Sequence, residues 1–409
     1  MPKQYGEGRR VGSLVVLTLL GGLALAGGCG GDESNPGHHA VTPSRDNVLP
    51  IRVDSGPTDS YVNGVFASVT VCVPGDDSQC ETISDLLVDT GSVGLRILSS
   101  ALSLSLPQQT GAGGRPVAEC LPFVDGYTWG PVQLADVKMA GEQAKSVPIQ
   151  VIGDPDFSAV PGRCTNLGLP PMDTLQDLSA NGLLGVGLFR QDCGSACEQS
   201  AAPGLYYECS SSGCDQAIER LSDQVQNPVW LFADDNNGVI IKLPSIPANG
   251  AASVNGSLVF GIGTRANNGL DTATILTTNA NGTFTTLYRG RPYGPSFIDS
   301  GSNGIFFLES ITTGIRVCND AQDWYCPSST QSVSATNRGA DGIATDDITF
   351  AVANAESLLA NLAHSAFSNL AGPNPDSFDW GLPFFFGRAV FTAIEGQETP
   401  AGYGPYLAY

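Results

Sequence analysis

The sequence predicts a mostly β protein in which two similar β lobes are accompanied by a few short helices. Val-, Thr- and Phe-rich runs bounded by Gly, Asn and Asp are many, and segments with helical periodicity are few. The chain also holds 50 Gly and 27 Pro, which indicates many turns. A short pattern around Asp89 recurs around Asp299, 210 positions later (299 − 89). The 409 residues, 42% of them hydrophobic, suffice for lobes at residues 48–230 and 231–409.

The N-terminus is predicted to be an export signal. Basic residues precede the apolar stretch Val11–Ala26, which is too short and too rich in glycine for a comfortable membrane span, so residues 1–28 are expected to be a signal peptide. Ala26-Gly-Gly-Cys29 resembles a bacterial lipoprotein cleavage site and predicts lipidation of Cys29, the alternative being ordinary cleavage nearby. Residues 29–47 would then be a tether. We expect an exported bacterial protein, on the periplasmic face of the outer membrane or the cell surface if lipidated, and periplasmic or secreted otherwise.

The net charge of −21 limits the possible partners. Nucleic acids and anionic lipids would repel this chain, so we expect no nucleic-acid partner and membrane contact only through a lipid anchor. The charge is compatible with work in acid, where it would be titrated away. We expect a monomer.

The cysteines predict five disulfides. Of the 11 cysteines, ten remain after Cys29, an even number for an oxidising compartment. Local spacing suggests four short links, and the remaining two cysteines are left for a longer one. The predicted pairs are Cys72 with Cys80, Cys193 with Cys197, Cys209 with Cys214, Cys318 with Cys326, and Cys120 with Cys164. A zinc site is a poorer interpretation, because the cysteines do not form paired C-x2-C sets and histidine is nearly absent.

Strands are expected from the start of the first lobe. Val48–Val53 is predicted to be an edge strand, because Pro50 cannot donate to a ladder. The triplet Asp54-Ser-Gly follows it but leads into Pro and polar residues, so Asp54 is interpreted as a turn residue. Phe66–Val73 and Ile83–Val88 then form a hairpin that ends at Asp89. Later, Ser357–Leu370 is the best candidate for a helix.

The doubled pattern carries the chemistry. Residues 86–97 read LLVDTGSVGLRI and residues 297–307 read FIDSGSNGIFF, so each acid follows apolar residues and precedes a hydroxyl residue, a glycine and a serine. Each is trailed by a glycine-flanked apolar segment, at Leu183-Leu184 and at Leu382. A carboxylate at the tip of a buried strand is costly unless another group shares its charge, and the repeat provides a partner.

In this order and spacing, roughly residues 60–395 resemble the pepsin-like aspartic peptidases. The chain is also similar to an uncharacterised bacterial family of exported proteins with the doubled motif. The first resemblance implies a bilobal pepsin-like fold, with pseudo-twofold related lobes. It also implies an aspartic endopeptidase that hydrolyses peptide or protein substrates with a water activated between Asp89 and Asp299, without a cofactor or a metal.

Elementary chemistry supports the same roles. Two adjacent buried carboxyl groups cannot both ionise, so they share a proton, and one can take a proton from water while the other donates to the scissile carbonyl. Residues beside the acids would support the pair: Thr90 and Ser300 by hydrogen bonds between the lobes, Ser92 and Ser302 by donating to the outer carboxylate oxygens, and Gly91 and Gly301 by allowing close approach. Serine at both outer positions favours an acidic working pH.

Two positions depart from the pepsin-like pattern. Arg96 stands where a tryptophan is usual, and it is expected either to pair with an acidic substrate or to bridge to a nearby carboxylate. No tyrosine lies at the usual spacing for the flap that closes over substrate. Tyr127 or Trp129 is the best candidate, the alternative being that both are core or loop aromatics.

A second class of function remains open, that of a non-catalytic lipoprotein that binds a peptide or glycan in the cleft. The intact acid loops favour the enzyme, because a binding protein has no need of two buried like charges. Histidine-dependent catalysis is disfavoured, because His364 is the only histidine outside the predicted tether.

Overall fold

A computed structural model describes residues 46–409, so the predicted signal peptide, most of the tether and Cys29 lie outside the described residues. The described part is mostly β, as predicted, with 24 strands and five α-helices of at most five residues. The helix predicted at residues 357–370 is wrong: α5 (Ala355–Leu359) ends early, and turns follow it. None of the helices of this part of the chain is both long and apolar enough to cross a membrane.

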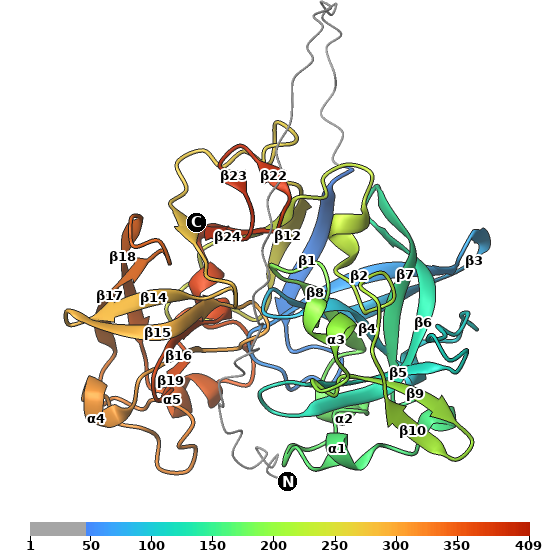
Figure 1. Cartoon of the computed structure of the whole chain (residues 1–409). Helices are drawn as coiled ribbons and strands as arrows, with labels where there is room; N and C mark the ends of the chain where they lie inside the picture. The colour runs from blue at the N-terminus through green and yellow to red at the C-terminus, as the bar shows by residue number, and fades with distance from the viewer. Residues whose placement is uncertain (1–45) are drawn as a thin grey trace, which may run out of the picture.

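The larger sheet has 15 strands, and Figure 1 shows that most of them belong to the blue and green half of the molecule. In spatial order they are β10 (Gly213–Gln216), β9 (Tyr206–Ser210), β5 (Val117–Pro122), β6 (Tyr127–Met139), β7 (Glu142–Ile152), β4 (Val93–Leu98), β8 (Gly182–Val186), β3 (Asp76–Asp89), β2 (Gly64–Val73), β1 (Val48–Asp54), β12 (Val254–Phe260), β11 (Gly238–Leu243), β21 (Arg388–Ala393), β24 (Tyr406–Ala408) and β13 (Ile275–Thr277).

The second sheet has seven strands, which lie in the orange half of Figure 1. In order they are β18 (Thr345–Val352), β17 (Gln331–Arg338), β14 (Phe284–Tyr288), β15 (Arg291–Ile298), β20 (Phe378–Trp380), β16 (Ile305–Phe307) and β19 (Ala371–Gly372). β22 (Glu398–Thr399) and β23 (Gly402–Tyr403) form a separate ribbon. The other α-helices are α1 (Gly162–Thr165), α2 (Leu175–Leu178), α3 (Ser195–Gln199) and α4 (Ser310–Thr313), and four single turns of 3₁₀ helix complete the elements of the described part.

The two sheets contain the same unit of four strands. In the first, β3 runs parallel to β8, β8 antiparallel to β4, and β4 parallel to β7. In the second, β15 runs parallel to β20, β20 antiparallel to β16, and β16 parallel to β19. Both units therefore place a later strand between the two strands that flank an acid-bearing loop, and the repeat seen in the sequence is also a repeat of strand pairing.

The register of the second unit corrects one correspondence. Val88 pairs with Leu184 in the first unit, and Ile298 pairs with Trp380 in the second. The counterpart of Leu183-Leu184-Gly is therefore Asp379-Trp380-Gly, and the segment at Leu382 begins a turn of 3₁₀ helix instead. A carboxyl group thus occupies the position that Leu183 holds in the first unit.

The first strand is not an edge strand. β1 pairs along its length with β12, and only its last three residues, Arg52–Asp54, pair with β2. Pro50 lies outside the β2 ladder, so its missing N–H costs little there. Since β1 joins β2 to β12, strands from both predicted lobes belong to one sheet. The two predicted lobes also share one large hydrophobic cluster, which includes Leu184 and Trp380.

All five predicted disulfides are confirmed. Four close short local loops, whereas Cys120–Cys164 joins β5 to α1 across 44 positions. The pairing agrees with folding in an oxidising environment.

Candidate active site

The two acids are presented by loops that bond directly to each other. Asp89 is the last residue of β3, and Asp299 directly follows β15. The Ser300 N–H donates to Thr90 Oγ1 at 2.9 Å, and the Thr90 N–H donates to Ser300 Oγ at 3.1 Å. Ser300 Oγ in turn donates to the carbonyl of Val88 at 2.8 Å. The predicted hydrogen bonds between the acid loops are therefore confirmed.

Glycine backbone holds the two carboxyl groups close. The Gly91 N–H donates to Asp89 Oδ1 at 2.8 Å and to Asp299 Oδ1 at 3.1 Å, so one donor reaches both acids. The Gly301 N–H donates to Asp299 Oδ1 at 2.7 Å. A Cβ atom on Gly91 would lie 2.7 Å from Asp299 Cγ, and one on Gly301 would lie 2.7 Å from Asp89 Oδ1. Neither position has room for a side chain.

The two outer serines behave differently. Ser302 Oγ donates to Asp299 Oδ2 at 2.9 Å, as predicted. Ser92 Oγ is buried and has no hydrogen-bond partner among the described residues, so the equivalent prediction for Asp89 is wrong. The two acids consequently have different hydrogen-bond environments although their sequences match.

Burial and mutual repulsion set the electrostatics of the pair. Asp89 is 7% exposed and Asp299 is half-buried, while Gly91 between them is exposed. The pKa of Asp299 lies well above its usual range. Burial is the largest cause, and the negative charges of Asp89 and Asp379 act in the same direction. The carboxyl group of Asp299 therefore keeps its proton to higher pH than an isolated aspartic acid does.

A third acid at this site was missed by the sequence reasoning. Asp379 of β20 is 4% exposed, and its charge acts on Asp299. The one available signal was an acid inside the otherwise apolar run Phe378–Phe386. Without the strand register, nothing indicated that this acid faces the other two.

Neither flap candidate is free to move in this structure. Tyr127 is 5% exposed and Trp129 is 4% exposed. The indole N–H of Trp129 donates to the carbonyl of Phe157 at 2.7 Å, and its ring packs edge-on against Tyr207. The Tyr127 N–H donates to the carbonyl of Pro170 at 3.0 Å. These contacts favour the alternative in which both are core aromatics.

Arg96 lies inside the protein. Its side chain is fully buried and pairs with Glu119 at 2.8 Å and with Asp192 at 2.9 Å. The Tyr206 hydroxyl donates to Asp192 at 2.7 Å. Burial and the charge of Glu119 raise the pKa of Asp192 well above its usual value. The structure therefore favours a bridging arginine over one that contacts substrate.

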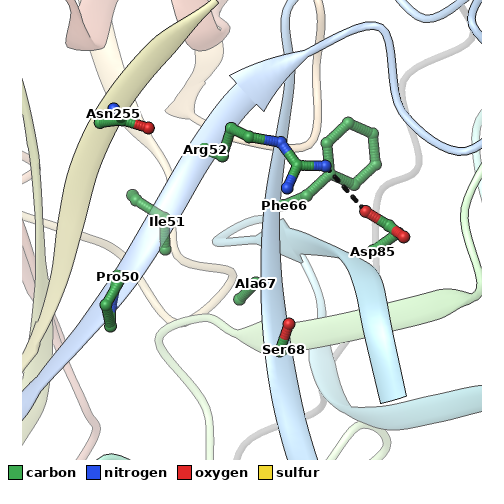
Figure 2. Close-up of a pocket in the computed structure, with 8 residues that line it drawn as sticks. All are labelled: Pro50, Ile51, Arg52, Phe66, Ala67, Ser68, Asp85 and Asn255. Carbon is green, nitrogen blue, oxygen red and sulfur yellow. Dashed lines mark hydrogen bonds and ion pairs between the residues drawn. The ribbon is translucent and has the colours of Figure 1, made fainter.

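One surface pocket lies away from the acid loops. The pocket has a volume of about 260 Å³ and is lined by residues of β1, β2 and β12 and by Asp85. Figure 2 shows the Arg52 guanidinium directed at the Asp85 carboxylate, and the two groups lie 2.9 Å apart. The pocket includes no residue of the loops at 89–92 or 299–302. The salt bridge is solvent-accessible, and it gives the pocket no chemistry beyond an ordinary surface ion pair.

Metal binding has little support in the described residues. The two groups of three potential ligands that lie close together each contain a disulfide, Cys72–Cys80 or Cys318–Cys326. Oxidised sulfurs are not thiolate ligands, so each group offers only one carboxylate.

A comparison of the whole chain with known families gives one match. A family described as "Protein of unknown function (DUF3443)" matches residues 43–409. The chain belongs to this family. The match includes both acid loops and Asp379. A search of curated proteins gave no match.

Proposed function

We propose that this member of the DUF3443 family is an aspartic endopeptidase with a bilobal, pepsin-like fold. The observation that carries the proposal is the pair of reciprocal hydrogen bonds between Thr90 and Ser300, which joins the two acid loops, together with one Gly91 N–H that reaches both carboxyl groups. The repeated unit of four strands supports the pepsin-like arrangement, because each copy delivers one acid.

In the proposed reaction the dyad holds one proton. The ionised carboxyl group takes a proton from a water molecule between the acids as the water oxygen attacks the scissile carbonyl carbon. The other carboxyl group donates its proton to the carbonyl oxygen, which gives a neutral gem-diol. The protonated carboxyl group then donates to the amide nitrogen while the ionised one takes a proton from a gem-diol hydroxyl group. The C–N bond breaks to give a carboxylic acid and an amine, and the dyad is left monoprotonated. An extended peptide would be held by main-chain hydrogen bonds along the cleft.

The test is cleavage of an unstructured protein from about pH 3 to about pH 8, with and without a statine-type transition-state inhibitor. Asp89→Asn and Asp299→Asn are each expected to abolish cleavage, since an amide cannot exchange the proton that the dyad shares. Asp54→Asn is the matched control. Asp54 also heads an Asp-Ser-Gly triplet and accepts from the Gly56 N–H at 2.9 Å, but it lies outside the acid loops, as the last residue of β1 and not as the turn residue that the sequence predicted.

The competing function is that of a lipoprotein that binds peptide or glycan without catalysis. Cleavage by either dyad variant at the wild-type rate would show that the dyad assignment is wrong. A wild type that binds peptide but never cleaves it would favour the binding protein.

We further infer that the protein is exported and anchored through lipid at Cys29. The five disulfides support an oxidising compartment. Cys29→Ser is expected to move the protein from the membrane fraction to the soluble fraction. Recovery of this variant in the membrane fraction would contradict lipid anchoring.

A further inference from the structure

A third carboxyl group is built into the second acid-bearing unit. Asp379 lies in β20 between two strands, paired with Phe297 of β15 and Phe306 of β16. Its side chain is only 4% exposed. The equivalent position in the first unit is Leu183, which packs with other apolar residues. Packing of the unit therefore does not require an acid there, and a buried acid is costly unless it has a role.

The hydrogen bonds around Asp379 identify its partner. The Ser302 hydroxyl lies between two acids: it donates to Asp299 Oδ2 at 2.9 Å and also interacts with the carboxyl group of Asp379. A hydroxyl group has a single hydrogen, so it can donate to only one of them. When it donates to Asp299, the interaction with Asp379 is favourable if Asp379 carries the proton and donates to Ser302 Oγ. The other oxygen, Asp379 Oδ1, is buried without a hydrogen-bond partner among the described residues.

The charges near Asp379 favour its protonated form. The titratable groups that act on it are Asp89 and Asp299, both acidic. The pKa of Asp379 is raised to about 8, mainly by burial and to a smaller extent by the charge of Asp89, while the hydrogen bond with Ser302 acts in the opposite direction. Asp379 is therefore neutral in acid and ionises near or above neutral pH.

We propose that Asp379 is a positioning residue for the dyad, which donates to Ser302 so that Ser302 directs its hydrogen to Asp299, and which, once ionised, helps the dyad to keep its shared proton. This inference rests on the proposed peptidase function. In the protonated state the chain of donors runs from Asp379 to Ser302 to Asp299, so the single hydrogen of Ser302 is directed to Asp299.

The role has a definite effect on the pH profile. Loss of the proton from Asp379 adds a negative charge close to the dyad, and this charge opposes the loss of the remaining dyad proton. The alkaline limit of activity should therefore lie at higher pH than the dyad alone would give. The acidic limit should not depend on this charge, because Asp379 is neutral there.

The experiment compares two variants of the disulfide-bonded protein. Asp379→Asn removes the titration but keeps a donor for Ser302, and Asp379→Leu restores the residue type of the first unit and removes the donor. Both are expected to move the alkaline limb of kcat/KM down by about one pH unit. Only the Leu variant is expected to lose kcat several-fold at the optimum, since Ser302 then loses its donor. Asp376→Asn, an exposed acid three residues earlier, is the control that changes the net charge equally.

A second readout does not need activity. Carbon-13 NMR of aspartate carboxyl groups in the wild type should show a titration near pH 8 that is missing in Asp379→Asn, with the Asp299 titration moved to lower pH. If the protein cleaves nothing but shows these changes, the three acids are coupled and the peptidase proposal alone fails. If Asp379→Asn leaves the alkaline limb and the carboxyl titrations unchanged, the role of Asp379 is wrong whatever the protein cleaves.

Discussion

At the scale of single residues, the acid loops are held by few atoms. Ser300 is fully buried, and its hydroxyl group both accepts from the Thr90 N–H and donates to the carbonyl of Val88. Ser92 lies two residues after Thr90, the counterpart of Ser300 in the first loop, and its buried hydroxyl oxygen has no hydrogen-bond partner among the described residues. The same residue type thus has very different consequences in the two loops.

Ser300→Ala is expected to lower the free energy of unfolding by about 3 kcal/mol, because it leaves a buried N–H and a buried carbonyl group without this partner. Ser92→Ala should change it by less than about 0.5 kcal/mol, because no hydrogen bond is lost. Urea denaturation measures both. Equal effects of the two substitutions would mean that the Ser300 hydrogen bonds do not stabilise the junction between the loops.

Arg96 provides a second prediction at this scale. Arg96→Met leaves Glu119 and Asp192 buried together without their cation, so we expect a loss of about 3–5 kcal/mol at neutral pH. The loss should shrink as the pH falls, because Asp192, whose pKa is raised by burial and by the charge of Glu119, becomes neutral. Denaturation at several pH values checks this.

The control for Arg96 is Arg115, which also pairs with two acids but is 40% exposed. Arg115→Met should cost less than about 1 kcal/mol. If Arg96→Met instead left stability unchanged and raised only KM, the arginine would contact substrate after all.

The limits of sequence reasoning are clear at the two serine positions and at Asp379. The doubled tetrapeptides were sufficient to predict that Asp89 and Asp299 lie close together, with the flanking glycines between them and the Thr90–Ser300 bonds, because each depends on local sequence and on one symmetry relation. The asymmetry of Ser92 and Ser302 depends on side chains from distant strands. The role of Asp379 could be seen only from the strand register, because it requires Trp380 to pair with Ile298. The sequence analysis matched Leu382 to Leu183, and this error of three positions left Asp379 outside the repeated unit.

At the scale of elements, the positions of the strands in the sequence were easier to predict than which strands pair with each other. Alternating and apolar runs predicted the hairpin of β2 and β3 that ends at Asp89. The predicted edge at β1 failed because Pro50 limits pairing on one side only. The prediction of a helix at 357–370 was wrong, although its apolar residues are buried. Phe367 and Leu370 pack in a hydrophobic cluster, but the chain that carries them forms turns and loops.

The hairpin of β5 and β6 yields the prediction at this scale. Cys120–Cys164 ties β5 to α1 across 44 positions, whereas Cys193–Cys197 spans four. Replacing the long link by two serines should lower stability by about 4 kcal/mol, and replacing the short one by about 2 kcal/mol, if the link acts by restricting the unfolded chain.

Hydrogen exchange should locate the effect of the long link. We expect faster exchange in β5 and near Tyr127 without Cys120–Cys164, because the hairpin then keeps only its sheet and core contacts. Unchanged exchange in this hairpin would show that the aromatic cluster holds it without the disulfide.

At the scale of the whole molecule, buried acids couple the stability of the fold to pH. The chain carries 40 acidic and 19 basic residues, and three of its buried acids have pKa values of about 7 to 8. Glu219 is 2% exposed, and burial raises its pKa to about 8, with a smaller effect in the same direction from Asp223. Burial also raises the pKa of Asp379 to about 8 and that of Glu142 to about 7. These groups keep their protons in the folded protein at pH values where the unfolded chain has lost them.

The folded state then binds more protons than the unfolded state between the two sets of pKa values. Stability should therefore be greatest below about pH 4.5 as far as these three acids are concerned, and should fall as the pH rises toward about 8. Glu219→Gln removes one of these titrations, so this variant should be more stable than the wild type by about 4 kcal/mol at pH 8 and nearly equal to it at pH 4.5. Glu198→Gln, an exposed acid nearby on α3, should match the wild type at both pH values. Thermal unfolding across this range measures the difference, and a Glu219→Gln curve parallel to the wild type would show that Glu219 is ionised in the folded protein. A fold that is stabilised by retained protons is suited to acid, which is also where a monoprotonated dyad would work.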